Sequence, residues 1–207
     1  MEIGNYTVHV VDDEESIRKS MAFLLATAGF TVRLHESATA FLAATASGLR
    51  NACLVTDLRM PDMSGVDLLR KLQERDTRLP AIVVTGHGDV PMAVEAMKAG
   101  AIDFIEKPFD DDVLIEAIKR AAATLVSGAK TDEDEATVRA RHGLLTERER
   151  QVLSGVVAGL ANKSIAYDLD ISPRTVEVHR ASVMSKMQAK SLPELVRMVL
   201  GAKLDRA

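Results

Sequence analysis

The stretch from Cys53 to Pro61, with the sequence CLVTDLRMP, most constrains how this chain can fold. The apolar run Ala52–Val55 at its start is continuous, rich in strand-forming residues and bounded by turn chemistry, which predicts a buried strand. That strand delivers the carboxylate of Asp57 to its C-terminal end, and Met60-Pro61 then stops the extended segment. Ligands of open parallel sheets bind at this end of the strands, although an isolated acid there is more often a helix cap. The other strands decide between these interpretations.

Three further runs, rich in apolar residues, predict parallel strands that end in chemically active side chains. These runs are Val8–Val11, Ala81–Val84 and Ala101–Glu106, followed respectively by Asp12 and Asp13, by Thr85, and by Lys107. Three carboxylates, one hydroxyl and one ammonium are therefore expected at one edge of the sheet. Hard oxygen ligands clustered in this way suit Mg²⁺, which takes a few carboxylates and keeps several waters. With Mg²⁺ and Lys107 neutralising charge, Asp57 can act as a nucleophile toward phosphorus, so the pattern predicts a phosphoryl-transfer site.

Helical patterns alternate with these strands. Ser16–Ala28 carries apolar residues at three-to-four spacing and is closed by Gly29, and Gly65–Glu74 shows the same periodicity. Strands that alternate with helices predict right-handed crossovers and a parallel sheet. Residues 1–126 are therefore predicted to form an α/β domain with a five-stranded parallel sheet in the flavodoxin-like order.

The charge distribution separates this domain from the rest of the chain. The net charge is −4, but residues 1–123 carry 13 Lys and Arg against 19 Asp and Glu, whereas residues 142–207 carry 10 against 7. A mildly basic part joined to an acidic part hints at nucleic acid as a partner of the second part. Residues 127–141 lack an apolar face and are predicted to form a linker, with a helical turn expected at Ala136–Ala140.

Residues 142–207 are predicted to form an all-α domain of four helices. Thr146 and Glu149 form a capping box that opens the first helix. Lys163–Leu169 is a short second helix, and Ser172-Pro173 supplies the cap and first-turn proline of a third. Two short helices joined by a tight turn describe a helix-turn-helix, although other helical hairpins share the pattern. The polar face favours the DNA-binding interpretation through its phosphate and base-edge partners, which are Arg174, Thr175, Glu177, Arg180 and Lys186, flanked by Lys163 and Lys190.

Both parts resemble known families. The first resembles the receiver domain of two-component response regulators, through Asp12-Asp13, Asp57 with Met60-Pro61 and Gly65, Thr85-Gly86, and Lys107-Pro108. The second resembles the LuxR-type DNA-binding domain, through LTERE at 145–149, NKSIA at 162–166 and SPRTVEVH at 172–179. Together they resemble the NarL/FixJ family of response regulators, and within it the FixJ branch most closely.

The resemblance to receivers implies roles for individual residues. Asp12, Asp13, Asp57 and the backbone carbonyl of Arg59 are expected to hold Mg²⁺ while Asp57 accepts a phosphoryl group. Lys107 is expected to stabilise the transferring group, with a cis bond before Pro108. Thr85 then follows the phosphoryl group, and Phe104 matches the switch aromatic, the alternative being plain core packing. Apart from the resemblance, Arg59 and His87 follow Asp57 and Thr85 by two residues and are expected to flank the path of the hydrolytic water, the alternative being that both are ordinary exposed loop side chains.

The resemblance to the LuxR type implies how DNA is contacted. Glu177, Val178 and Ala181 are expected to face base edges. The residues expected to position the DNA backbone are Lys163, Arg174, Thr175, Arg180 and Lys190. His179 is either a phosphate donor or a packed side chain. The implied partners are a FixL-type sensor histidine kinase, promoter DNA of nitrogen-fixation or microaerobic genes, RNA polymerase, and a second copy after phosphorylation.

Three alternatives remain open at this point, and the first is another NarL-type regulator with a different regulon. Phosphatases of the haloacid-dehalogenase type use a similar Asp/Thr/Lys set with Mg²⁺, but take their nucleophile from an Asp-x-Asp pattern on the first strand, whereas here Asp12 and Asp13 are adjacent. A receiver with a protein or RNA target is opposed by the helix start at Ser172. No apolar run approaches ~18 residues and the N-terminus lacks a signal peptide, so we expect a cytoplasmic protein without membrane association and without turnover beyond its own phosphorylation and dephosphorylation.

Overall fold

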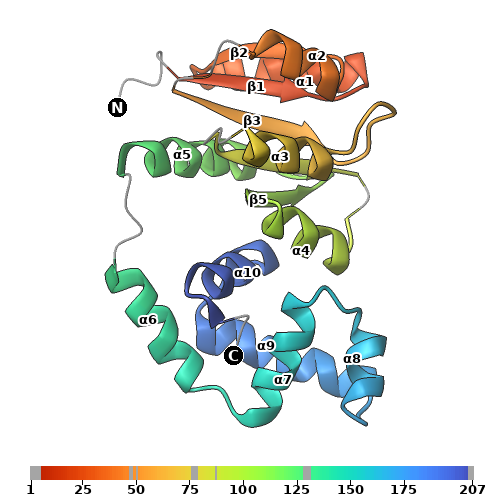
Figure 1. The fold of residues 1–207 in the computed structure, drawn as a ribbon, viewed down its shortest axis with the longest axis vertical. Helices are drawn as coiled ribbons and strands as arrows, with labels where there is room; N and C mark the ends of the chain where they lie inside the picture. Colours follow the sequence, from red (N-terminus) through yellow and green to blue (C-terminus); the bar gives the residue numbers. More distant parts are fainter. Residues whose placement is uncertain are drawn as a thin grey trace. The chain divides into compact units, whose positions relative to one another are not determined.

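The computed structural model describes residues 6–46, 49, 51–75, 79–86, 88–127 and 132–204 (Figure 1). The chain divides into two compact units. One consists of Met1–His87 with Ala99–Gly128, and the other of Gly88–Lys98 with Ala129–Ala207. Within these described ranges, no helix combines the length and the apolarity that crossing a bilayer requires.

The first unit contains a five-stranded sheet in the order β2-β1-β3-β4-β5, in which every neighbouring pair is parallel. Its strands are β1 Thr7–Val11, β2 Thr31–His35, β3 Ala52–Asp57, β4 Ala81–Thr85 and β5 Ala101–Glu106. The register pairs Val11 with Thr56, and Asp57 with Val84. The strands therefore end level with one another, and the predicted doubly wound fold is confirmed.

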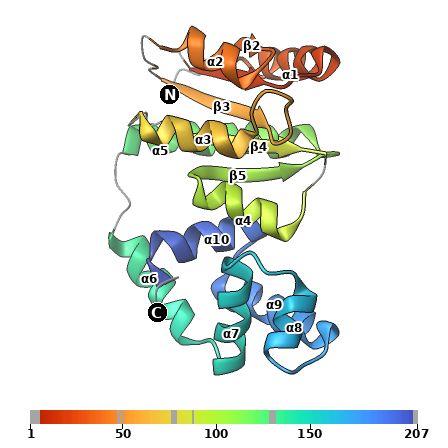
Figure 2. The ribbon, with the colours of Figure 1, turned by 45° about the vertical axis from the view of Figure 1, so that its right-hand side comes forward.

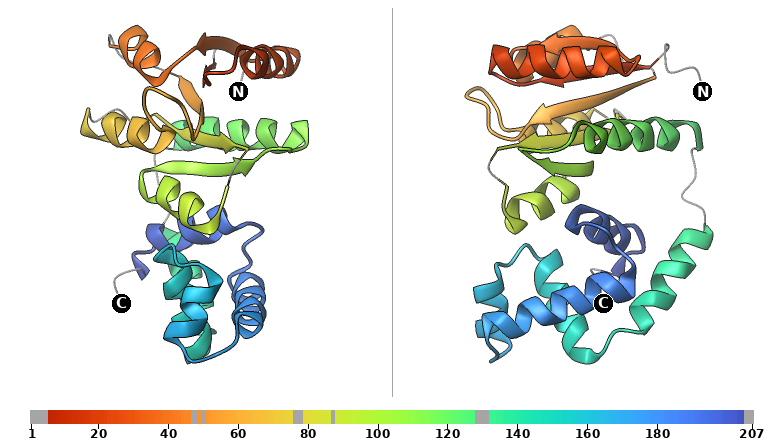
Figure 3. Two further views of the ribbon diagram at one scale, coloured as in Figure 1. Left: turned by 90° about the vertical axis from the view of Figure 1, so that its right-hand side faces the viewer. Right: turned by 180° about the vertical axis from the view of Figure 1, so that it is seen from behind.

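Helices cover both faces of this sheet. The helices between and after the strands are α1 Glu15–Thr27, α2 Ala38–Ala44, α3 Gly65–Glu74, α4 Val90–Lys98 and α5 Asp111–Ser127. Helices α1 and α5 lie on one face, and α2 and α3 lie on the other (Figure 2 and Figure 3). Met21 and Leu25 of α1 and Leu114 and Ile118 of α5 pack in one apolar cluster with strand residues such as Val10. Because both faces are covered, the central strands are continuous apolar runs, which is why the sequence revealed them.

The second unit is helical in its described part. Its further helices are α6 Asp132–Gly143, α7 Glu147–Val157, α8 Asn162–Asp168, α9 Pro173–Met187 and α10 Leu192–Gly201. The predicted capping box is present, since Thr146 and Glu149 each accept a backbone amide of the other. Ser172 caps α9 by accepting the amide of Thr175, with Pro173 in the first turn. Helices α8 and α9, joined by residues 169–172, form the predicted helix-turn-helix.

Helix α6 lies mostly within the predicted linker and is longer than the turn expected at Ala136–Ala140. Val138 of this helix is buried in the apolar cluster of α7, α9 and α10. Arg139 Nη2 donates to the carbonyl of Ala202 at 2.7 Å, and Arg141 Nη1 donates to the carbonyl of Met187 at 3.3 Å. The arginines thus bind carbonyls at the C-terminal ends of α10 and α9, which are otherwise orphan acceptors. Such contacts leave no apolar periodicity in the sequence.

Candidate functional site

The carboxyl edge of the sheet brings together Asp12, Asp57 and Lys107. Lys107 Nζ lies 3.1 Å from Asp12 Oδ2 and 3.4 Å from Asp57 Oδ1, so one ammonium bridges two carboxylates. The side chains of Asp12, Asp57 and Lys107 are 3%, 12% and 21% exposed, respectively. Water therefore screens these charges poorly. One cation facing two anions leaves this edge with excess negative charge.

Asp57 is the last residue of β3, and its carboxylate is held in place from two sides. The amide of Arg59 donates to Oδ2 at 2.6 Å, while Lys107 approaches Oδ1. Burial raises the pKa of Asp57 above its ordinary value, and the Asp12 carboxylate adds to the rise. The Arg59 amide and Lys107 oppose this rise in pKa. The carboxylate is thus oriented but incompletely compensated, which is the electrostatic condition that a bound cation relieves.

Gly65 explains how the chain passes so close to Asp57. The amide of Gly65 donates to the carbonyl of Leu58 at 2.9 Å, which brings the start of α3 against the end of β3. A Cβ at position 65 would lie 2.4 Å from the carbonyl oxygen of Asp57. Since non-bonded atoms do not approach that closely, a side chain here must displace the backbone that carries Asp57.

The remaining predicted receiver residues lie around this edge. Thr85, 1% exposed, ends β4, and its carbonyl accepts the amide of Lys107 at 2.8 Å. The bond between Lys107 and Pro108 is cis, as expected. Phe104 is half-buried on β5, and Arg59 is exposed beyond β3. His87 lies outside the described residues.

The predicted magnesium ligands are brought together only in part. Asp12 and Asp57 share Lys107, whereas the Asp13 side chain is exposed. In the described part of the chain, no three acidic, histidine or cysteine side chains are gathered as a metal-binding group. The donors are nevertheless all oxygens, and the edge carries excess negative charge. Both features fit a hard cation that keeps several of its waters.

The predicted DNA-contacting face lies on α9 and the neighbouring turns. Arg174 and Glu177 form an ion pair at 2.8 Å, with side chains 84% and 48% exposed. Val178 is 58% exposed, so its apolar side chain is accessible on this face. Ala181, Lys163 and Lys190 are exposed as well, and Thr175 bonds to the cap residue Ser172. A helix with exposed polar and apolar side chains on one face is suited to lie in a DNA major groove.

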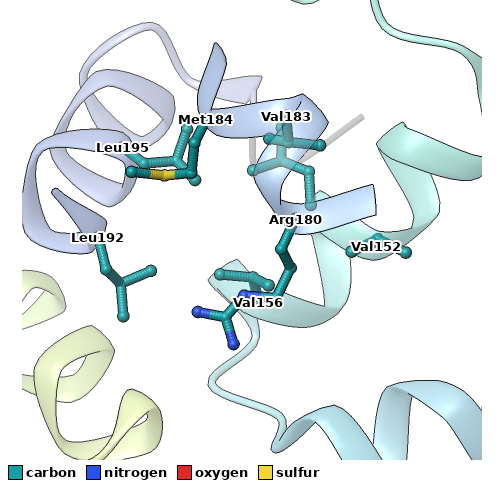
Figure 4. A pocket seen from close by; sticks show the side chains of 8 residues that line it. Val152, Val156, Arg180, Val183, Met184, Leu192 and Leu195 are labelled. Atoms are coloured by element: carbon teal, nitrogen blue, oxygen red, sulfur yellow. The ribbon is translucent and has the colours of Figure 1, made fainter. Parts of the chain in front are cut away.

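Arg180 and Lys186 have partners inside the unit that the sequence pattern did not reveal. Arg180 Nη1 donates to Asn162 Oδ1 at 2.6 Å, and burial lowers the pKa of this arginine. Its side chain also lines a small apolar pocket between α7, α9 and α10 (Figure 4). Lys186 Nζ lies 2.7 Å from Oε2 of the buried Glu149. Both cations therefore fasten α9 to neighbouring helices.

Comparison with known proteins identifies the family. Residues 8–119 match the model of the response regulator receiver domain, and residues 143–199 match that of bacterial regulatory proteins of the LuxR family. The transcriptional regulatory protein FixJ of Rhizobium meliloti is 68% identical over 196 residues, which cover 95% of this chain and 96% of that protein. This chain belongs to the FixJ-like response regulators.

Solved structures agree with this membership in the FixJ-like family. The crystal structure titled FixJ-N is 66% identical with a TM-score of 0.55, and covers 57% of this chain and 94% of that one. Full-length FixJ from B. japonicum is 47% identical with a TM-score of 0.53, and covers 97% of this chain and 98% of that one. A FixJ-like regulator is a transcriptional regulator with a receiver domain and a LuxR-type DNA-binding domain.

Proposed function

We propose that Asp57 accepts a phosphoryl group from a FixL-like sensor histidine kinase, and that the phosphorylated protein activates transcription in the cytoplasm. The observation that carries this proposal is the Asp57 carboxylate at the sheet edge, oriented by the Arg59 amide and bridged to Asp12 by Lys107. The membership in the FixJ-like family supports nitrogen-fixation or microaerobic genes as the targets.

In the transfer step, the Asp57 carboxylate forms an O–P bond as the N–P bond of a kinase phosphohistidine breaks. The electron pair of the broken bond stays on the leaving imidazole nitrogen. Lys107 stabilises the charge on the equatorial oxygens, and the Arg59 amide holds the attacking carboxylate in position. A magnesium ion bound by Asp12, Asp13, Asp57 and the Arg59 carbonyl would supply further charge neutralisation.

The signal then passes from the site to the dimer. The Thr85 hydroxyl binds the new phosphoryl group, and Phe104, half-buried before transfer, moves inward. These shifts favour pairing of two receivers through a face that includes β5. Two paired DNA-binding domains then contact two half-sites and recruit RNA polymerase.

The proposal is tested by incubating the full-length protein with acetyl phosphate or a FixL-like kinase, with and without Mg²⁺. We expect an acid-stable, base-labile phosphoryl label on the protein that depends on Mg²⁺. The labelled protein should also bind a nitrogen-fixation promoter fragment more tightly in a gel-shift assay. A steady release of phosphate from monoesters without stable label would instead favour the phosphatase alternative.

Replacing Gly65 by alanine is expected to slow the labelling of Asp57 at least ~10-fold, because the added methyl group displaces the strand end that positions the nucleophile. The rate of labelling by acetyl phosphate measures this effect. Gly143→Ala is the matched control, since a Cβ at position 143 meets no atom within 4 Å. Equal labelling rates in the two variants would contradict the steric argument.

Glu177→Ala and Lys163→Ala are expected to change DNA binding in different ways, the first through sequence preference and the second through overall affinity. Loss of Glu177 should relax preference at one base position by about 1–3 kcal/mol, because its carboxylate accepts from a base edge. Loss of Lys163 should weaken binding to all sequences and flatten the salt dependence by about one unit. Affinities of both variants for a set of single-base operator changes, measured at several salt concentrations, separate these effects. A uniform loss in both variants would refute the division of roles.

A further inference from the structure

Arg18 binds the backbone of the acidic pair that begins the loop after β1. Its Nη1 atom donates to the carbonyl of Asp12 at 2.7 Å and to the carbonyl of Asp13 at 2.9 Å. Arg18 is half-buried in the first turns of α1, so its side chain reaches back toward the strand end. Neither the magnesium ligands nor the phosphoryl-transfer residues assigned above include it.

The two carbonyls belong to the two peptide planes on either side of the Asp13 α-carbon. Each plane is rigid, so only two backbone dihedrals separate them. Fixing both carbonyl oxygens therefore fixes the direction in which the Asp13 side chain leaves the backbone. This matters because Asp13 is exposed and is not held by burial.

Asp12 is fixed by other contacts in the same loop. Its Oδ1 accepts the amide of Glu14 at 2.9 Å, and its Oδ2 meets Lys107. The Asp12 side chain thus has partners of its own. The orientation of Asp13 depends instead on the two hydrogen bonds that Arg18 donates to the backbone carbonyls. Groups that orient metal ligands typically change metal affinity by 10- to 100-fold when they are removed.

We infer that Arg18 is a positioning residue for Asp13, and that it sets the affinity of the acidic edge for a divalent cation. The inference rests on the proposed function, because that function places the cation at this edge. The carbonyl oxygens of Asp12 and Asp13 accept hydrogen bonds from Arg18 and are therefore not available to the cation. The loop thus offers the cation its carboxylates as ligands.

The charge of Arg18 and its hydrogen bonds act with opposite signs. A guanidinium close to the acidic pair repels Mg²⁺, so removal of the charge alone would tighten binding. Loss of the two hydrogen bonds from Arg18 releases the Asp13 backbone, which must then be ordered when the cation binds. If a variant without the Arg18 guanidinium binds Mg²⁺ more weakly, the loss must therefore come from the changed position of Asp13 and not from the removed charge.

The test compares Arg18→Met with Lys19→Met in the full-length protein by calorimetric titration with MgCl₂. Methionine keeps an apolar stem but removes the donors. Lys19 carries the same charge on the next residue of α1, and it pairs with Glu15 at 2.6 Å on the exposed surface. We expect Mg²⁺ to bind about 10-fold more weakly to Arg18→Met. Lys19→Met should stay within about 2-fold of the parent protein, because the charge that it removes is solvent-exposed.

A second measurement separates positioning from a general loss of folding. The rate of labelling by acetyl phosphate is followed against Mg²⁺ concentration. In Arg18→Met the half-maximal concentration should rise about 10-fold while the maximal rate stays within about 2-fold. Unchanged or tighter Mg²⁺ binding by Arg18→Met, or a fall in the maximal rate alone, would overturn the inference. Absence of Mg²⁺ binding by the parent protein would overturn the proposed metal site, and the inference with it.

Discussion

Asp57→Asn is expected to abolish phosphorylation of the receiver by either acetyl phosphate or a kinase. The amide keeps the shape of the side chain, and its oxygen can still accept the Arg59 amide that now bonds to Oδ2 at 2.6 Å. It lacks the negative charge that attacks phosphorus, and it offers no anion to the Lys107 ammonium that lies 3.4 Å from Oδ1. Acid-stable, base-labile label should fall below detection, while circular dichroism stays that of the parent protein.

The matched control for this prediction is Asp67→Asn. Asp67 is about half exposed in the first turn of α3, where it pairs with Arg70 at 3.0 Å and accepts from Ser64. Removing its charge costs little, because exposed ion pairs contribute at most about 1 kcal/mol. This control should label at the parent rate. Full labelling of Asp57→Asn would show that another residue accepts the phosphoryl group.

The position of the site was predictable because its central strands, β1, β3 and β4, are buried. The runs that became β1, β3 and β4 are almost entirely buried, and their ends, like those of the half-buried edge strand β5, could be placed to within about two residues. Edge strand β2 left no such run, since Thr31, Arg33 and Leu34 are exposed on it. The sequence therefore predicted the number of strands through the fold class, without locating this one.

The contacts that orient the functional groups were less predictable. Arg18 acts on backbone carbonyls, and α6 is fastened by Arg139 and Arg141 in the same way, so no pairing of side chains marks them in the sequence. Glu149 was expected only to cap α7. The structure adds bonds from residues more than 30 positions away, which depend on how α9 crosses α7.

Glu149→Gln is expected to destabilise the helical unit by about 3 kcal/mol. Glu149 is 5% exposed and accepts from Lys186 at 2.7 Å, from Ser182 at 2.5 Å and from the Thr146 amide at 2.7 Å. The neutral amide leaves the Lys186 ammonium without its counter-ion, and one of its two ends can no longer accept. Breaking a buried ion pair from one side costs about 3–5 kcal/mol, and the lower end applies here because Lys186 is 34% exposed.

The effect should also depend on pH in a defined direction. The hydrogen bonds from Lys186, Ser182 and Thr146 lower the pKa of Glu149 from an unfolded value of 4.5 to about 2. A carboxyl group with a depressed pKa in the folded state contributes its full stability above pH 4.5 and loses it as pH falls toward 2. The difference between the parent protein and Glu149→Gln should therefore shrink over this window.

Hydrogen exchange of the α7 and α9 amides in the full-length protein measures this loss locally, which avoids assuming that two units unfold together. Glu177→Gln serves as the control, since its carboxylate is 48% exposed and pairs only at the surface with Arg174. That variant should change protection by no more than about 0.5 kcal/mol. DNA affinity should fall in Glu149→Gln because α9 loses at least one of its two side-chain bonds to Glu149 of α7. Parent-like protection in Glu149→Gln would mean that apolar packing alone holds the recognition helix.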